Sequence, residues 1–201
     1  AGQDLGDRRP GTADWPPDLQ QTLNDYLNPN IKLITSLPAP VICAVNGVAA
    51  GAGASIALAC DMVLAADSAS FIQSFSKIGL VPDAGSSWNL PRRIGIARAM
   101  GLALTATPLL AADAEAWGLI WKRYEDSALL PAAQALAAQL ANGPTVAHAA
   151  TKMLLQQAAT NDFETHLDHE ARAQKSCAIS ADYAEGVQAF LDKRSPRFVG
   201  E

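Results

Sequence analysis

A run of small residues between Asn46 and Ser55 is the first candidate for chemistry in this sequence. It follows a short apolar segment and opens a helical pattern, and side chains this small leave the first N–H groups of the helix exposed. The helix macrodipole favours negative charge at the same end. The run therefore predicts a site for an anion, or for an oxyanion that develops during a reaction. Close packing of the helix against a strand needs small residues equally, so both interpretations stay open.

This run does not fit the common phosphate-binding motifs. No Gly-Lys-Ser/Thr follows it, which disfavours a P-loop. Gly51 and Gly53 form a GxG, but Ile56 occupies the third glycine position of a dinucleotide fingerprint. The sequence also contains no Gly-x-Ser-x-Gly, so Ser-His-Asp hydrolysis lacks its usual platform.

Asp83 is the candidate for proton transfer. It ends an apolar approach, Gly-Leu-Val-Pro, at a turn that precedes a helix. In a partly apolar pocket, burial would bring the pKa of this carboxyl group closer to working pH, as a general acid or base requires. The same position is typical of a helix N-cap, which is the simpler interpretation of the pattern alone.

The histidines give no comparable signal. His166 and His169 share a helical stretch with Glu170, but two imidazoles at this spacing lack a defined third ligand and are more typical of a solvated helix face. His148 stands among alanines, as a packing or surface residue does. We therefore expect no metal site.

Composition limits the class of protein. The chain has 201 residues, of which 49% are hydrophobic and 17% charged, which suits a globular protein with a sizeable core. A net charge of -5 without a Lys/Arg run argues against nucleic acid or an anionic membrane as a partner. No apolar run has the length of a membrane span. The three cysteines are an odd set, which favours thiols in a reducing compartment, and we expect a cytoplasmic location.

The elements that must position these residues follow from hydrophobic periodicity and from Gly and Pro. Strands come first along the chain, connected by helices, and a helical block follows. The predicted strands are 41–45, 62–66 and 70–75, with one further strand-like segment at 119–124. The predicted helices are 18–37 with a break near Pro29, 52–60, 86–106, 111–117, 128–142, 145–159, 162–176 and 181–192.

Over essentially the whole chain these residues resemble the enoyl-CoA hydratase/isomerase, or crotonase, superfamily. The stretch Ala-Gly-Gln-Asp-Leu at 1–5 is similar to the end of that family's first oxyanion segment. Residues 40–47, with the small-residue helix and Cys60-Asp61, are similar to its second. The resemblance implies that the backbone amides of Gln3 and Ala52 polarise a thioester carbonyl and stabilise an enolate.

Two departures narrow the implied reaction. Ser55 and Phe75 stand where hydratases of this family usually carry glutamates that activate water, so simple hydration is doubtful. Residues 75–83 instead resemble the branch that isomerises the ring epoxide of phenylacetyl-CoA, as do stretches at 97–104, 115–121, 180–186 and 190–198. In that branch the position of Asp83 carries the catalytic acid/base. Ser86 and Ser87 depart from its common Gly-Thr.

The resemblance also implies the architecture. We expect an α/β fold with a crotonase-like spiral of ββα turns over 1–125, whose first strands are missing from this chain, and a C-terminal helical region over 126–201 used for trimer formation. The expected ligand is an acyl-CoA substrate, with no cofactor besides its coenzyme A. The protein itself is expected to form a homotrimer or a dimer of trimers. The implied substrate-binding residues are Ala1, Asp4, Leu5, Ala50, Gly51, Phe75, Val81, Pro82 and Trp88, with Phe190 and Lys193 touching coenzyme A from a neighbouring subunit.

The sequence leaves two other functions open. One is a hydratase or thioester hydrolase on the same fold. The other is a non-catalytic acyl-CoA-binding subunit, which the absent glutamates and the altered turn at 86–87 would suit.

Overall fold

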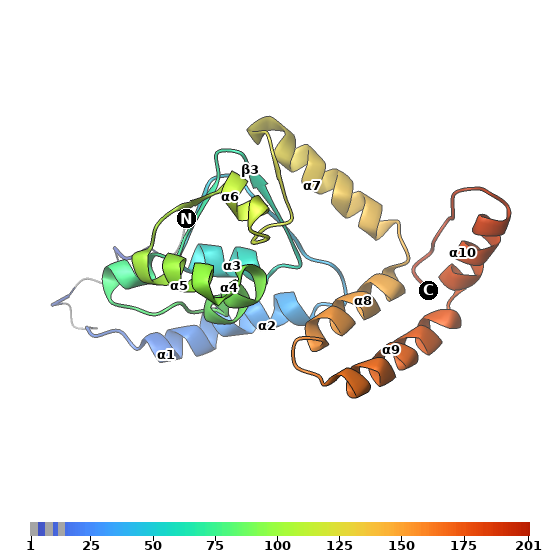
Figure 1. Ribbon diagram of the computed structural model, residues 1–201, viewed down its shortest axis with the longest axis horizontal. Helices are drawn as coiled ribbons and strands as arrows, with labels where there is room; N and C mark the ends of the chain where they lie inside the picture. Colours follow the sequence, from blue (N-terminus) through green and yellow to red (C-terminus); the bar gives the residue numbers. More distant parts are fainter. Residues whose placement is uncertain (1–3, 7–9, 12–14) are drawn as a thin grey trace. The chain divides into compact units, whose positions relative to one another are not determined.

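The computed structural model describes residues 4–6, 10–11 and 15–201 (Figure 1). The chain forms two compact units. The first contains the described residues up to Thr35 together with Val41–Ala133, and the second contains Ser36–Pro40 and Gln134–Glu201. Within the described ranges, no helix has the length and apolar character that a membrane span requires.

Two small sheets form the centre of the first unit. In one, three parallel strands lie in the order β1-β3-β6; in the other, β4 pairs with β2 in parallel and with β5 antiparallel. Strands β2 and β5 were not predicted, since each is too short to show a period. The strands are β1 (Ile42–Val45), β2 (Val48–Ala50), β3 (Met62–Ala66), β4 (Ser70–Ile72), β5 (Leu109–Leu110) and β6 (Lys122–Tyr124).

Strand β3 is the most buried strand. Val63, Leu64 and Ala65 are fully buried, as expected of a parallel strand with neighbours on both sides. Its register pairs Ala44 of β1 with Leu64, and Leu64 in turn with Lys122 of β6. The continuous apolar run in the sequence therefore predicted this strand correctly.

Helix α3 (Ala52–Ala59) follows β2 through a single residue, Gly51. Gly51 has φ 51° and ψ -122°, a conformation that is essentially restricted to glycine. Most of α3 is buried, and Leu58 is 1% exposed. The small residues therefore serve close packing of this helix as well as the sharp turn before it.

Three helices follow between the strands of the first unit: α4 (Ser86–Ile94), α5 (Ile96–Thr105) and α6 (Ala111–Ala116). The prediction of one helix over 86–106 was wrong. Gly95, with φ 76° and ψ 159°, ends α4 and begins α5. The extended segment predicted over 70–75 also ends early, because the chain turns at Ser74 into a 3-10 helix, η2 (Ser74–Ile78).

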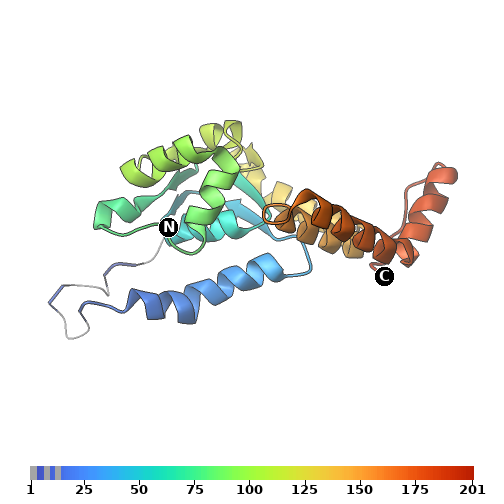
Figure 2. The ribbon, with the colours of Figure 1, turned by 60° about the horizontal axis from the view of Figure 1, so that its bottom comes forward.

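A rod of three helical segments lies alongside α3 (Figures 1 and 2). It consists of α1 (Leu19–Thr22), the π-helical turn η1 (Leu23–Leu27) and α2 (Asn28–Ser36). The predicted break near Pro29 was wrong. The N–H of Asn28 bonds to Leu23, five residues back, and this wider turn accommodates the proline that follows it.

The second unit is helical. Helix α7 (Asp126–Ala141) leads into it, and α8 (Thr145–Gln157) and α9 (Phe163–Ala178) lie side by side, followed by α10 (Ala181–Leu191) (Figure 1). Side chains cap two of these helices: Asp162 accepts from the N–H of Thr165, and Ser180 accepts from the N–H of Tyr183. The four helices predicted here are confirmed, with ends that differ by one or two residues.

Candidate active site

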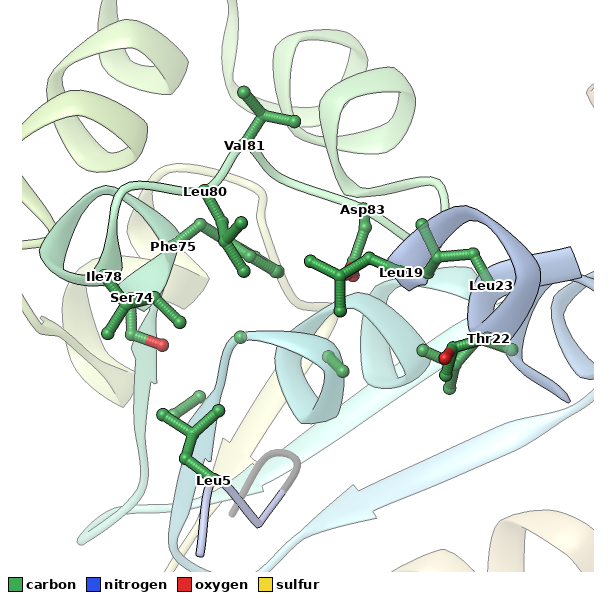
Figure 3. Close-up of a pocket in the computed structure, with 14 residues that line it drawn as sticks. Leu5, Leu19, Thr22, Leu23, Ser74, Phe75, Ile78, Leu80, Val81 and Asp83 are labelled. Atoms are coloured by element: carbon green, nitrogen blue, oxygen red, sulfur yellow. The ribbon is translucent and has the colours of Figure 1, made fainter. Parts of the chain in front are cut away.

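A cavity of about 270 Å³ opens in the first unit (Figure 3). Its walls come from the rod α1-η1, from the β2-α3 turn and from the segment that joins β4 to α4. Most of its lining is apolar. The lining residues are Leu5, Leu19, Thr22, Leu23, Leu27, Ala50, Gly51, Ala52, Ser74, Phe75, Ile78, Leu80, Val81 and Asp83.

The N-terminus of α3 forms one side of this cavity. Ala52 is the first residue of the helix, so its N–H has no carbonyl four residues earlier inside the helix. The turn is held in place because the N–H of Gly51 donates to the carbonyl of Ile72 at 2.9 Å and the carbonyl of Gly51 accepts from the N–H of Ser55 at 3.0 Å. The small-residue run thus places a backbone donor at a cavity wall, as an oxyanion site requires.

Asp83 lines the same cavity, and its Oδ1 atom is buried. Figure 3 shows its side chain directed into the cavity beside Leu19. It is not the N-cap of α4, because that position belongs to Gly85, and no side chain caps this helix. The carbonyl of Asp83 accepts from the N–H of Ser86 at 2.8 Å, which turns the backbone into α4 and leaves the carboxyl group facing the cavity.

The two positions that carry glutamates in hydratases have different environments. Ser55 is fully buried, and its hydroxyl donates to the carbonyl of Gly51 at 3.1 Å, so it serves the turn rather than the cavity. Phe75 is 5% exposed and lines the cavity with its ring. Among the described lining residues, Asp83 is consequently the only one with an ionisable side chain.

A buried hydrogen bond holds the segment that carries Asp83. The hydroxyl of Ser86 donates to Oε1 of Gln73 at 2.9 Å, and both side chains are almost completely buried. Gln73 immediately precedes η2, while Ser86 is the first residue of α4. This bond therefore fixes the two ends of the loop that supplies Phe75 and Asp83.

The far end of α3 is fixed by Arg93. Its guanidinium group donates to the carbonyls of Leu58 and Cys60, both at 3.0 Å, and to the carbonyl of Leu119 at 3.2 Å. Burial lowers the pKa of Arg93 from its ordinary value. A cation at this end is favourable because the C-terminus of a helix carries partial negative charge.

Cys43 and Cys60 lie together in the first unit. A hydrogen bond with the Cys60 thiol, and secondarily burial, raises the pKa of the Cys43 thiol. A thiol that stays protonated is a poor nucleophile. The Cys43 thiol is therefore a poor candidate for covalent catalysis, and Cys60 is part of the buried core.

The predicted binding residues are distributed unevenly. Leu5, Ala50, Gly51, Phe75 and Val81 line the cavity, whereas Asp4, Pro82 and Trp88 are not among its lining residues. The indole of Trp88 is instead covered by the Arg92 guanidinium, whose central carbon lies 3.2 Å from the ring centroid. Ala1 and Gln3, including the predicted amide donor of Gln3, lie outside the described residues.

Phe190 and Lys193 belong to the second unit. Phe190 is 82% exposed and lines an apolar groove of about 450 Å³ with Val187, Leu191 and Phe198. Lys193 follows α10 in the left-handed region, at φ 55°, and its N–H donates to the carbonyl of Phe190. Their predicted contact with coenzyme A remains a prediction.

The histidines of α9 make local contacts. Nε2 of His166 lies 3.6 Å from Oε1 of Glu170, and Nδ1 of His169 lies 2.8 Å from Oε1 of Gln157. In the part of the chain that the structure describes, no three His, Cys, Asp or Glu side chains are grouped as metal ligands.

Sequence reasoning missed half of the cavity wall. Hydrophobic periodicity placed Leu19, Leu23 and Leu27 on one face of the first predicted helix. It did not show that this face would line a cavity instead of packing against a core. On the opposite wall, the position of Ser74 in the chain did not show that it would lie close to Gly51. The lining residues not predicted are Leu19, Thr22, Leu23, Leu27, Ser74, Ile78 and Leu80.

Comparison with known proteins now places this geometry in a family. The family model described as "Enoyl-CoA hydratase/isomerase" matches residues 1–201. The chain belongs to the enoyl-CoA hydratase/isomerase family. Its members are enzymes, and the predicted crotonase-type α/β fold is confirmed by a structural match.

Two relatives and one structure illustrate the match. The 1,2-epoxyphenylacetyl-CoA isomerase of Escherichia coli is 50% identical over 201 residues, covering all of this chain and 77% of the relative. A probable enoyl-CoA hydratase of Rhodobacter capsulatus is 48% identical over 200 residues, covering 100% of this chain and 76% of that protein. A crystal structure assigned as an enoyl-CoA hydratase/isomerase from Mycobacterium abscessus superposes with a TM-score of 0.95 at 35% identity, covering all of this chain and 77% of that one.

Proposed function

We propose that this member of the enoyl-CoA hydratase/isomerase family is an acyl-CoA isomerase that converts a ring-1,2-epoxyphenylacetyl thioester to the oxepin thioester, or a 3-enoyl thioester to the 2-enoyl form. The observation that carries the proposal is the single ionisable side chain, Asp83, among the described residues of a largely apolar cavity. The 50% identity to a 1,2-epoxyphenylacetyl-CoA isomerase supports the ring substrate.

In the proposed reaction the thioester carbonyl accepts a hydrogen bond from the N–H of Ala52 and, by resemblance, from that of Gln3. The Asp83 carboxylate removes a proton from C2, and the charge moves onto the thioester oxygen as an enolate. For a 3-enoyl thioester, Asp83 returns the proton to C4, and the double bond shifts to C2–C3. No atom is gained or lost.

The ring substrate follows the same proton path. After the proton leaves C2, the bond between the two epoxide carbons breaks, which expands the ring to the seven-membered oxepin. Asp83 then returns the proton to a ring carbon. Each reaction requires one carboxyl group beside an enolate-like oxygen, and the proposed path uses no cofactor besides the coenzyme A of the substrate.

Water addition needs a different arrangement. A hydratase must both activate water and protonate the substrate, which a phenyl ring at Phe75 and the hydroxyl of Ser55, already bonded to Gly51, do not supply. This is the reason for preferring isomerisation over hydration despite the hydratase names among the relatives.

The test is the isosteric substitution Asp83→Asn, assayed with both isomerisation substrates. Loss of a general acid/base predicts a fall in turnover of roughly 10²- to 10⁴-fold. The matched control is Asp113→Asn, which changes an exposed carboxylate on α6. In addition, the wild type should exchange the C2 hydrogens of phenylacetyl-CoA with D₂O, and Asp83→Asn should not.

Three results would overturn the proposal. Wild-type turnover by Asp83→Asn on both substrates would exclude the role of Asp83. Substantial hydration of crotonyl-CoA without isomerisation would favour the hydratase. Binding of acyl-CoA without turnover of any of these substrates by the wild type would favour the binding subunit.

The oligomeric state is a second part of the proposal. The second unit leaves large apolar side chains exposed, among them Ile179, between α9 and α10, at 86% and Phe190 of α10 at 82%. Such surfaces usually mark an interface, which supports the homotrimer, or dimer of trimers, that the family resemblance implies. Light scattering of the purified protein would test it, and a monomer at micromolar concentration would refute it.

A further inference from the structure

Ser74 is a cavity residue that the mechanism above does not use. It begins η2, directly before Phe75, and it lines the cavity. Its Oγ lies 3.1 Å from the point where a Cβ on Gly51 would be. Since Gly51 immediately precedes Ala52, the Ser74 hydroxyl stands next to the N-terminus of α3, on the side where the proposed oxyanion forms.

The Ser74 hydroxyl differs from the two buried hydroxyls nearby. Ser55 donates to the carbonyl of Gly51, and Ser86 donates to Gln73. No group within the described ranges hydrogen-bonds to the hydroxyl of Ser74, and Figure 3 shows its oxygen pointing into the cavity from the wall opposite Leu19 and Leu23. A hydroxyl group in a largely apolar cavity needs an acceptor from the ligand or from water.

We propose that the Ser74 hydroxyl donates a hydrogen bond to the thioester oxygen of the substrate, beside the N–H of Ala52. The inference rests on the proposed acyl-CoA chemistry. The oxygen carries little charge in the ground state and close to a full charge in the enolate, so the bond strengthens as the proton leaves C2. Ser74 then acts with the backbone amides as a side-chain member of the oxyanion site, while its proton stays on Oγ throughout.

The sharpest test pairs a Ser74 substitution with removal of the ligand carbonyl. Phenylacetyl-CoA contains the thioester oxygen, whereas its thioether counterpart, S-(2-phenylethyl)-CoA, has a CH₂ in place of the C=O. We expect Ser74→Ala to weaken binding of the thioester roughly tenfold and binding of the thioether less than twofold. Ser74→Cys, which keeps the size but is a weak donor, should resemble Ser74→Ala.

Turnover and a spectroscopic readout complete the test. Ser74→Ala should lower kcat roughly 10- to 100-fold, with the D₂O exchange of phenylacetyl-CoA lowered in parallel. The carbonyl stretch of bound ¹³C-labelled thioester should move to higher frequency, because the oxygen is less polarised. The control is Ser76→Ala, which changes an exposed serine on the same 3-10 helix and should leave all three readouts unchanged.

The outcomes separate this inference from the proposed function. Equal weakening of thioester and thioether by Ser74→Ala, or an unchanged carbonyl stretch, would overturn the role of Ser74 while leaving the function intact. If the wild type neither binds phenylacetyl-CoA nor exchanges its C2 hydrogens, the proposed function fails, and the Ser74 inference falls with it.

Discussion

The two units of the molecule are stabilised in different ways. Nearly all of the almost fully buried side chains belong to the first unit, where β3 and α3 supply many of them. The second unit, every residue of which the structure describes, buries only Ala189, Lys152 and Asp182 to that degree. Two of these three carry charge, which is the reverse of an ordinary core.

The charged residues of the second unit bind backbone groups. Nζ of Lys152 donates to the carbonyl of Ala39 at 3.1 Å, and the Asp182 carboxylate accepts from the N–H groups of Val199 and Gly200 at 2.7 and 3.0 Å. The first unit thus holds its cavity mainly by apolar packing and buried backbone bonds, with Arg93 as a charged group at the far end of α3. In the second unit, most of the few strongly buried side chains are charged groups that bind the backbone. We expect substitutions in the first unit to have the larger consequences.

The largest effect is expected at the β2-α3 turn. Gly51→Ala places a Cβ 3.1 Å from Oγ of Ser74 in a backbone conformation that other residues avoid. The free energy of unfolding should fall by about 1–3 kcal/mol. Turnover should fall on the order of a hundredfold, because the Ala52 amide is displaced. Denaturant unfolding and isomerase assays would measure the two effects.

Gly101→Ala is the matched control for Gly51→Ala. Gly101 lies inside α5, where a new Cβ would meet nothing within 4 Å besides its chain neighbours and the backbone of its own helix. This change should raise the free energy of unfolding by about 0.5–1 kcal/mol and leave turnover unchanged. Equal behaviour of the two variants would contradict the view that the turn is held by close packing.

The next effect concerns the loop that carries Asp83. Ser86→Ala removes the donor to Gln73 and leaves a buried amide oxygen without it, which should cost about 1–3 kcal/mol of unfolding free energy. Ser87→Ala, one residue later and exposed, should change it by less than about 0.5 kcal/mol. Thermal unfolding of the two variants provides the comparison, and a neutral Ser86→Ala would show that the bond does not hold the loop.

A smaller effect is expected on the opposite wall of the cavity. Residues of α1, η1 and α2 are only half-buried or exposed, so Leu23→Ala should disturb stability little. Because Leu23 lines the cavity, KM for the phenylacetyl-type substrate should rise about tenfold with kcat nearly unchanged. Tyr26→Ala, on an exposed face of the same rod, is the control. A fall in kcat with unchanged KM would argue that the rod positions the reacting atoms.

The smallest effect belongs to the second unit. Bonds from Arg194 and from the N–H of Arg197 lower the pKa of Glu185 from 4.5 to about 2. A lowered carboxyl pKa in the folded state contributes stability above the unfolded pKa and loses it as the pH falls through the folded value. The Arg197 amide should therefore stay protected from hydrogen exchange above pH 4.5 and lose protection toward pH 2. If Glu185→Gln destabilised the protein more than Ser86→Ala, the contrast between the units would fail.

The sequence predicted most elements of the first unit because each had a clear pattern. The apolar run of β3 and the small residues of α3 indicated both their type and their burial. Besides the short strands β2 and β5 and the early end of β4, the prediction failed at two places: Gly95 divides α4 from α5, and the π-turn before Pro29 keeps a helix continuous. Neither leaves a signature in hydrophobic periodicity, because both depend on backbone geometry.

The candidate site was predicted in part for a related reason. The residues alone pointed to the N–H groups at the start of α3 and left Asp83 between catalysis and capping. The cap was excluded only when Gly85 proved to begin α4. Ser74 and Leu23 are far apart in sequence but line opposite walls of one cavity. No local sequence pattern predicts such a pairing.

Arg93 fixes the C-terminal end of helix α3, so any tilt of the helix about that end would move its N-terminus. The helix has eight residues, so its N-terminus lies about 12 Å from the end that Arg93 binds, and a tilt of about 5° there would swing the Ala52 amide by about 1 Å. An error of that size in a reacting geometry costs roughly a hundredfold in rate. The hydrogen bonds of Arg93 at the C-terminal end of α3 therefore help to fix the direction of the Ala52 N–H at the other end.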